Sequence, residues 1–283
     1  MKLNKIILII ILILFLDYNY TYSRRPLNKN ILESHLNTIY DPTRFHGFNE
    51  TGTTFGVDTI YCIVMPNRKE YMMNKITEMN VRCVFFDAIT PGDLSEQDIN
   101  NLSSINTFTL FNYSQMYKKK TKLALQLSFV MCYLNAIKTN KETIIVFEDD
   151  IKQNDLSTLP DSIEQFKTSD FKIFYLGHCY LNCKKQRVKE NYLIGINDRI
   201  FCMHAIVYKV RYLSEIINNI FYMTEPIDNM LNNWLLKNKN FACTSETTYF
   251  DQNMELGSNL EYILRARNIT DKDLFSCKKL NIR

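Results

Sequence analysis

The chain has 283 residues, of which 46% are hydrophobic and 23% are charged. This is the composition of an ordinary globular protein, and the length allows one large α/β domain or two small ones. The net charge of +4 is small and the basic residues are scattered, so we expect no nucleic-acid partner.

The N-terminus has the pattern of a secretory signal. A short basic segment, residues 1–5, comes before an unbroken run of Ile, Leu and Phe over residues 6–16. This run is shorter than the roughly 20 residues that span a bilayer, and the order of basic and apolar segments is typical of a signal peptide. We therefore predict a signal peptide or signal anchor over residues 1–23. The cleavage region has few small residues, so membrane attachment through residues 3–16 stays open.

Such a signal predicts a location in the lumen of the secretory pathway, as in the endoplasmic reticulum or Golgi, or outside the cell. Sequons for N-glycosylation begin at Asn19, Asn49, Asn101, Asn112 and Asn268. The chain also has eight cysteines, some of which can pair in an oxidising lumen. We expect a disulfide between Cys202 and either Cys179 or Cys183. A zinc site that adds His178 or His204 to these cysteines is the alternative, although the spacing is not that of a standard zinc finger.

A folded domain is predicted to begin after a linker. Residues 24–55 contain several Pro, Gly and Asn and few apolar side chains, which is typical of a stem, and the domain is expected to cover residues 56–283. It opens with a strand over residues 59–65, a helix over residues 70–80 and a second strand over residues 81–86. This order of strand, helix and strand indicates a parallel α/β unit.

The most informative segment follows the longest predicted helix, residues 115–139. A strand that ends in four apolar residues, 144–147, runs directly into Glu148, Asp149 and Asp150. A strand that is apolar throughout is typical of a sheet buried on both faces, and such sheets bind ligands at their carboxyl edge. Adjacent carboxylates repel one another, so one takes up a proton, all are solvated, or a cation neutralises them. Mn²⁺ or Mg²⁺ is the natural cation, whereas a plain acidic turn is the alternative.

The remaining segments continue the α/β pattern. Strands are predicted over residues 171–177, 201–208 and 241–244, and helices over residues 157–168, 210–221 and 225–236. Asp228 falls in the first turn of the last helix, where an acidic residue is favoured. Residues 250–258 are expected to form a polar loop, and residues 277–283 a basic tail.

In their order, these segments resemble glycosyltransferase family 25, which includes procollagen and bacterial lipooligosaccharide galactosyltransferases. Residues 61–70 are similar to the family's YVINLPRRKDR segment, and residues 145–151 to its LVLEDDV core. Further matches, in the family's order, are residues 86–89, 125–129, 175–177, 204–205 and 226–228, and Gln252 with Ser258. The resemblance covers about residues 59–262, which is nearly the whole predicted domain.

The resemblance implies a GT-A-type fold, a Rossmann-like α/β sandwich with a mixed, mostly parallel sheet that binds a nucleotide sugar. It also implies a divalent metal, Mn²⁺ or Mg²⁺, and a UDP-sugar donor. Asp149 and Asp150 are then the expected metal ligands, because a metal between carboxylates and diphosphate stabilises the charge of the leaving nucleotide. The expected nucleotide-sugar contacts are Arg68, Lys69, Glu148, Asp149 and Gln252.

An inverting transfer, which the resemblance implies, needs a general base to take the acceptor's proton. Asp228 is the first choice for this base and Asp251 the second. His204 is either a metal or donor contact or a structural residue beside Cys202. We therefore expect an enzyme that transfers galactose or glucose from a UDP-sugar to a hydroxyl group of a protein or glycan.

Two other functions remain open at this point. One is a secreted, non-catalytic glycan-binding or structural protein on the same fold, because Val64 and Phe129 replace the family's usual Asn and His. Tyr71 also replaces an Arg that is common in the family. The other is a metal-dependent phosphohydrolase, although the sequence has no recognisable nucleophile or phosphate-binding motif for it.

Overall fold

The computed structural model describes residues 39–97, 120–178, 180–181, 189–190, 192–196, 199–220, 227–238 and 241–256. The chain divides into two compact units, and nearly all described residues belong to the unit made of residues 41–93 and 120–283. The predicted signal segment, residues 1–23, and the predicted basic tail, residues 277–283, lie outside the described residues. The fold below is that of the larger unit.

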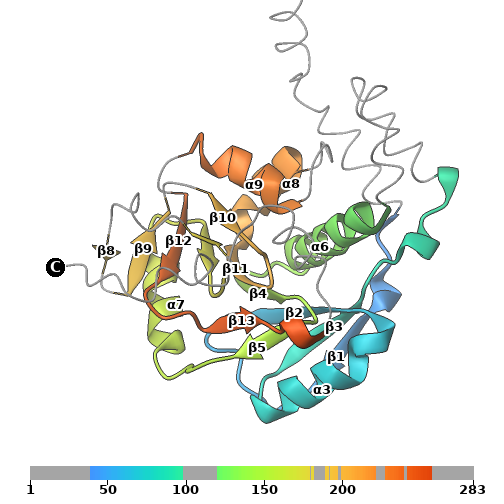
Figure 1. Cartoon of the computed structure of the whole chain (residues 1–283), viewed down its shortest axis with the longest axis horizontal. Coiled ribbons are helices and arrows are strands. Elements are labelled where there is room, and N and C mark those ends of the chain that lie inside the picture. The colour runs from blue at the N-terminus through green and yellow to red at the C-terminus, as the bar shows by residue number, and fades with distance from the viewer. Residues whose placement is uncertain are drawn as a thin grey trace, which may run out of the picture. The chain divides into compact units, whose positions relative to one another are not determined.

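The larger unit is built on a nine-stranded sheet with the order β1-β3-β2-β4-β11-β6-β12-β9-β8 (Figure 1). Its strands are β1 (Phe45–Phe48), β2 (Thr59–Val64), β3 (Cys83–Asp87), β4 (Thr143–Phe147), β6 (Ile173–Tyr175), β8 (Lys189–Glu190), β9 (Leu193–Gly195), β11 (Ala205–Lys209) and β12 (Ala242–Ser245). Strands β3, β2 and β4 are parallel neighbours, and β6 and β12 form another parallel pair. Between them β11 is antiparallel to both β4 and β6. The predicted mixed sheet is therefore confirmed, and it is mostly parallel in its core, where β11 is the one antiparallel strand among β3, β2, β4, β6 and β12.

Helices cover both faces of this sheet (Figure 1). They are α3 (Lys69–Glu78), α6 (Lys120–Lys138), α7 (Leu159–Thr168), α8 (Leu213–Ile220) and α9 (Ile227–Leu235). Buried side chains of α3 and α7 share one core with Ile60, Cys62 and Ile145 of the central strands. On the opposite face, the hydroxyl of Tyr61 donates to Asn135 of α6 at 2.7 Å. Because both faces are covered, β4 and β11 are buried at every position, which explains why their sequences are mostly apolar.

The fold begins earlier than the sequence predicts. Strand β1 (Phe45–Phe48) lies in the predicted stem, yet it pairs antiparallel with β3 at the edge of the sheet. Phe45 packs on Phe86 and Phe48 on Phe85, with ring centroids 4.8 and 5.0 Å apart. The stem prediction is thus wrong for this strand. The segment has only two large apolar residues, and their burial depends on the facing strand rather than on a local pattern.

A second strand replaces part of the predicted polar loop over residues 250–258. Strand β13 (Phe250–Gln252) pairs antiparallel with β5 (Ile151–Gln153), which directly follows the acidic triplet. Both strands are too short to show alternation in the sequence. Their pairing brings the C-terminal part of the described chain to the acidic residues.

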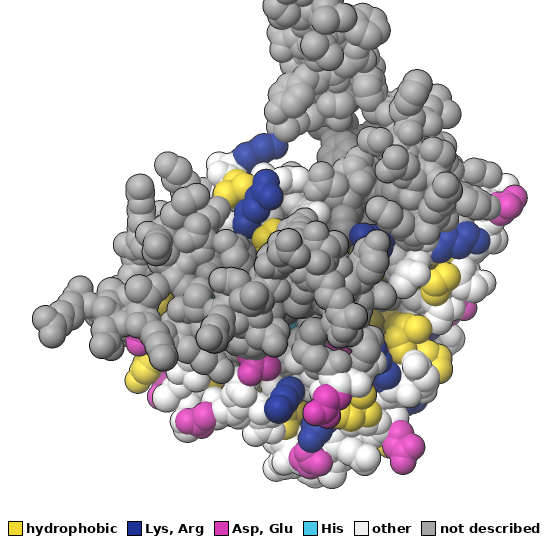
Figure 2. All heavy atoms as spheres, viewed as in Figure 1, with side chains coloured by type: hydrophobic (Ala, Val, Ile, Leu, Met, Phe, Trp, Pro, Cys, Tyr) yellow, Lys and Arg dark blue, Asp and Glu magenta, His cyan; other side chains and the backbone are white. Residues whose placement is uncertain are grey.

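In the lower part of Figure 2, Lys and Arg side chains lie between Asp and Glu side chains. Among the described residues, no helix combines the length and the apolar character that crossing a membrane would require.

Candidate active site

The acidic triplet leaves the carboxyl end of β4, between β2 and β11 in the middle of the sheet. Asp149 and Asp150 are buried, and Glu148 is partly buried. The backbone N–H of Glu148 donates to the carbonyl of His204 at 2.9 Å, which holds the turn against the start of β11. The carboxylates therefore lie at the edge of the sheet where α/β folds bind their ligands.

The guanidinium of Arg68 is the cation beside Asp149. Arg68 ends the short helix η2 (Pro66–Arg68) after β2, and its Nη1 lies 2.8 Å from Asp149 Oδ1. The other oxygen, Asp149 Oδ2, accepts the backbone N–H of Met65 at 2.8 Å. Arg68 Nη2 also donates to the carbonyl of Leu256 at 3.0 Å. Asp149 thus has a partner for each oxygen, and Arg68 ties it to the C-terminal helix η6 (Met254–Leu256).

Asp150 has a different environment. Its Oδ2 accepts the side-chain amide of Gln252 at 2.7 Å, and its backbone carbonyl accepts the N–H of Asn253 at 2.6 Å. Its Oδ1 is buried and has no hydrogen-bond partner among the described residues. A buried carboxylate oxygen left in this way fits an additional ion or water, so Asp150 fits a divalent cation.

Within the described residues no group of three or more His, Cys, Asp and Glu side chains is arranged to hold a metal. The zinc alternative needs Cys179 and Cys183, which lie outside the described residues, so it stays untested. A Mg²⁺-like cation needs few protein ligands, because it usually keeps water and binds substrate phosphates. Asp150 meets this need better than Asp149, whose oxygens are already engaged by Arg68 and Met65.

Glu148 takes up a proton more readily than an ordinary glutamate. Burial raises its pKa well above the usual range, and the charges of Asp150, Asp149 and Asp228 raise the pKa further. The repulsion between the three adjacent carboxylates is thus reduced in two ways. Arg68 neutralises Asp149, and the environment of Glu148 favours its neutral form.

Asp228 comes to this cluster from the first turn of α9 (Ile227–Leu235). Besides raising the pKa of Glu148, its charge raises that of Tyr175, after the larger effect of burial. Asp228 Oδ1 accepts the N–H of Asn229 at 2.9 Å. The fold therefore brings the predicted base into the neighbourhood of the acidic triplet, although the two are distant in sequence.

His204 joins β11 to β13. Its Nε2 lies 3.0 Å from the carbonyl of Phe250, and because a carbonyl only accepts, this nitrogen carries the hydrogen. Burial lowers the pKa of His204 and lowers that of His178 to about 4, so both rings are neutral at pH 7. Next to them, a Cβ on Gly177 would lie 2.0 Å from the Phe250 carbonyl oxygen, so only glycine fits. The contact of His204 with the Phe250 carbonyl is thus a structural one, which joins two strands.

Asp251, the second-choice base, lies on β13 and is half-buried. Its Oδ2 accepts the side-chain amide of Asn154 at 3.0 Å. Its carboxylate acts on the pKa of both His178 and His204. Asp251 therefore faces the histidines and Asn154.

Cys202 is disulfide-bonded, and because its partner lies outside the described residues, the pairing with Cys179 or Cys183 stays a prediction. The described cysteines that stay free are Cys62, Cys83, Cys132 and Cys243, all of which are buried. Cys202 Sγ lies 3.9 Å from Gln252 Oε1. The disulfide therefore abuts the residue that contacts Asp150.

A family model described as glycosyltransferase family 25 (LPS biosynthesis protein) matches residues 60–261. The matched region runs from β2 through the acidic triplet and α9 to β13, and it covers more than half of the chain. The chain belongs to glycosyltransferase family 25. No curated protein matches it. Family membership makes the protein a glycosyltransferase, with a sugar donor and an acceptor as substrates, and it argues against the non-catalytic alternative.

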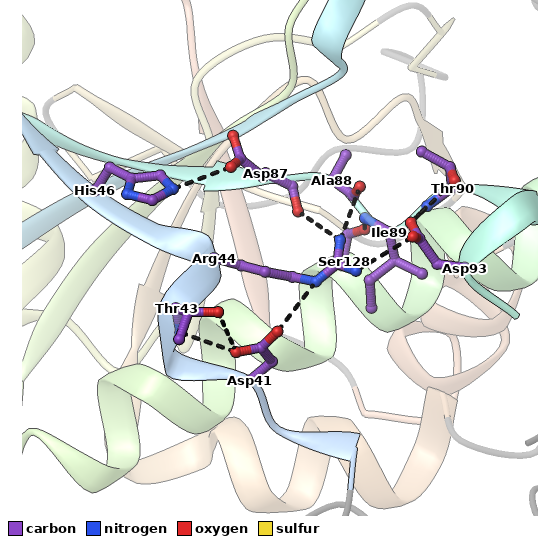
Figure 3. A network of polar contacts seen from close by, with 10 residues as sticks. All are labelled: Asp41, Thr43, Arg44, His46, Asp87, Ala88, Ile89, Thr90, Asp93 and Ser128. Atoms are coloured by element: carbon purple, nitrogen blue, oxygen red, sulfur yellow. Dashed lines mark hydrogen bonds and ion pairs between the residues drawn. The ribbon is translucent and has the colours of Figure 1, made fainter.

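In this family 25 glycosyltransferase, Lys69 does not join the acidic triplet. Its Nζ lies 3.0 Å from Asp87 Oδ1 at the carboxyl end of β3, while His46 Nε2 lies 3.0 Å from Asp87 Oδ2. Burial opposes ionisation of Asp87, but hydrogen bonds from Lys69 and His46 outweigh it and lower the pKa. Figure 3 shows His46 and Arg44 converging on this strand end from the β1 side. Sequence reasoning missed this network because it placed His46 and Arg44 in the stem.

Two other residues of the glycosyltransferase site were missed. The hydroxyl of Tyr71 on α3 donates to the carbonyl of Ile151 at 2.9 Å, and it accepts the side-chain amide of Asn253 at 3.1 Å. These bonds tie α3, the acidic turn and the segment after β13 together. The only sequence signal was that Tyr71 replaces the Arg common in the family.

Proposed function

We propose that this glycosyltransferase transfers galactose or glucose from a UDP-sugar to a hydroxyl group of a protein or glycan, with inversion and with Mn²⁺ or Mg²⁺. The observation that carries the proposal is Asp150, whose Oδ1 is buried without a partner at the carboxyl edge of the sheet. A buried anionic oxygen beside Arg68 suits a cation bound together with an anionic diphosphate.

In this proposal Asp150 holds the cation, and Asp149 adds a ligand if its contact with Arg68 rearranges. The cation would neutralise the charge that develops on the leaving nucleoside diphosphate. Arg68 supplies a second positive charge, and the planar fork of its guanidinium suits phosphate oxygens. Its ion pair with Asp149 and its bond to Leu256 hold that fork in place.

The proton of the acceptor hydroxyl goes to Asp228 in this proposal. An inverting transfer needs a carboxylate on the face of the sugar opposite the leaving group. Asp228 comes from the first turn of α9, and its charge acts on Glu148 of the acidic triplet. Asp251 is the second choice, because its charge acts on His178 and His204, whereas that of Asp228 acts on Glu148. Asp228→Asn should lower kcat strongly and leave the KM for the donor nearly unchanged.

A donor screen tests the proposal most directly. The purified protein is mixed with UDP-galactose, UDP-glucose or UDP, with Mn²⁺ or with EDTA, and thermal stability and release of UDP are measured. We expect a rise in melting temperature and slow UDP release only with the metal. Asp150→Ala should abolish both, whereas Asp161→Asn, at an exposed acid in α7, should abolish neither. Absence of metal-dependent UDP binding in the wild type would refute the metal and donor assignment.

We also propose that the enzyme works in the lumen of the secretory pathway. The disulfide at Cys202 supports this, because disulfides persist in oxidising compartments. Expression with the N-terminal segment in a cell with a secretory pathway, followed by fractionation, tests it. A protein recovered only from the cytosol with Cys202 reduced would contradict the location.

A further inference from the structure

The side chain of Gln252 is the only neutral side-chain donor to Asp150 among the described residues. It lies in β13, which the sequence analysis expected to be a polar loop. We propose that Gln252 is a positioning residue that sets the orientation of the Asp150 carboxylate and leaves Oδ1 for the cation. This inference rests on the proposed metal-dependent function, and it replaces the expected role of Gln252 as a direct nucleotide-sugar contact.

The backbone places Gln252 in register with the acidic turn. In the pairing of β13 with β5, Gln252 lies opposite Ile151, the residue after Asp150. The next residue along, Asn253, donates its N–H to the carbonyl of Asp150 at 2.6 Å. The segment of Gln252 and Asn253 therefore contacts both the backbone carbonyl and the carboxylate of Asp150. Because these contacts already restrict Asp150, its side chain loses little additional conformational freedom when a ligand binds.

The two oxygens of Asp150 are not equivalent in this arrangement. Oδ2 accepts the Gln252 amide at 2.7 Å and lies 3.8 Å from Arg68 Nη1, whereas Oδ1 has no partner among the described residues. Turning the plane of the carboxylate would break the bond to Gln252. The bond from Gln252 to Oδ2 thus favours the orientation of the carboxylate in which Oδ1 is left for the proposed cation.

The neutrality of the amide is the second part of the argument. The guanidinium of Arg68 pairs closely with Asp149 at 2.8 Å and lies farther from Asp150, at 3.8 Å, whereas Gln252 holds Asp150 without adding a positive charge. An amide can therefore orient the carboxylate and leave its negative charge to attract a cation. On its other side, Gln252 Oε1 faces Cys202 Sγ at 3.9 Å. Turning the amide over would place Oε1 against the carboxylate, which is repulsive.

Gln252→Leu tests the role, because leucine removes the amide and keeps a similar volume. The matched control is Gln153→Leu, an exposed glutamine of the paired strand β5. Binding of Mn²⁺ alone is measured by electron paramagnetic resonance, and UDP-sugar turnover is measured at several Mn²⁺ concentrations. We expect Gln252→Leu to weaken Mn²⁺ binding by about 10–100-fold, as loss of a residue that supports a metal ligand does. Gln153→Leu should bind Mn²⁺ like the wild type.

Kinetics distinguish positioning from direct contact. A positioning role predicts that saturating Mn²⁺ restores most of kcat and leaves the KM for the donor near the wild-type value. Unchanged Mn²⁺ affinity together with a raised donor KM would overturn the proposal in favour of direct nucleotide-sugar contact. Melting temperatures of the two glutamine variants show whether both fold.

A crystal structure of Gln252→Leu separates this proposal from the proposed function. If the wild type binds neither Mn²⁺ nor UDP, the metal assignment fails, but the orientation of Asp150 in the variant can still be read. We expect its carboxylate to turn away from the position that it has beside Gln252. An unchanged carboxylate in the folded variant would overturn the positioning role, whatever the activity.

Discussion

Replacing Arg68 by Met tests whether the guanidinium is the cation that neutralises Asp149. The ion pair spans 2.8 Å, and its side chains are only 20% and 10% exposed. Removing one partner of a buried pair costs about 3–5 kcal/mol, because the other charge stays buried and unpaired. The N–H of Met65 still donates to Asp149, so we expect the lower end, a loss of about 3 kcal/mol in the free energy of unfolding.

Urea unfolding of the purified variants measures this loss, and thermal unfolding should show a fall in Tm of about 2–4 °C per kcal/mol for a domain of this size. The double variant Arg68→Met/Asp149→Asn is the matched control, since asparagine removes the unpaired charge and still accepts from Met65. We expect it to be more stable than Arg68→Met alone. A single variant within about 0.5 kcal/mol of the wild type, or a double variant as unstable as the single one, would refute the reasoning.

The pH dependence of the loss provides a second check. Burial raises the pKa of Asp149 above its ordinary value of 3.8, and the Met65 N–H and Arg68 oppose that rise. An acid with a raised pKa in the folded state binds its proton more tightly when folded, so stability falls as the pH rises from 3.8 through the raised pKa. Without Arg68 the pKa rises further. The stability gap between wild type and Arg68→Met should therefore be wider at about pH 7 than at about pH 4, and an equal gap at the two pH values would contradict this account.

Three other predictions concern the surroundings of the site. Gly177→Ala should destabilise the fold by about 3 kcal/mol or more, because its Cβ would lie 2.0 Å from a backbone oxygen, whereas Gly92→Ala, with its nearest atom at 3.6 Å, should be tolerated in the same unfolding assay. Burial keeps the pKa of His178 at about 4, below its ordinary 6.5, so its contribution to stability is lost as the pH falls from 6.5 to about 4. His178→Gln should flatten that part of the pH–stability curve, and an unchanged slope would contradict the assignment. Cys202→Ser should lower the free energy of unfolding by about 2–4 kcal/mol and release one new thiol on labelling, and an equally stable variant would speak against a stabilising disulfide.

The central strands and the acidic triplet could be predicted from the sequence. Strand β4 is buried on both faces, so its residues 144–147 are all apolar, and the change to three acids marks the end of the strand without reference to the rest of the fold. The long helix α6 was visible for a similar reason, since its apolar stripe repeats over several turns. The order of these segments was also enough to indicate the family, which the match over residues 60–261 confirms.

Only the tertiary structure shows which side chain pairs with each acid of the triplet. Arg68, Asp149 and Gln252 lie in three separate segments, and no local pattern states that the guanidinium pairs with Asp149 while an amide takes Asp150. Strands β1 and β13 were missed for the same reason. Their few residues form strands because of the partner across the sheet, so the information is in the pairing and not in the segment. Short-range patterns therefore located the carboxylates, and the long-range packing that sets distance and burial determined which of them stays available for a ligand.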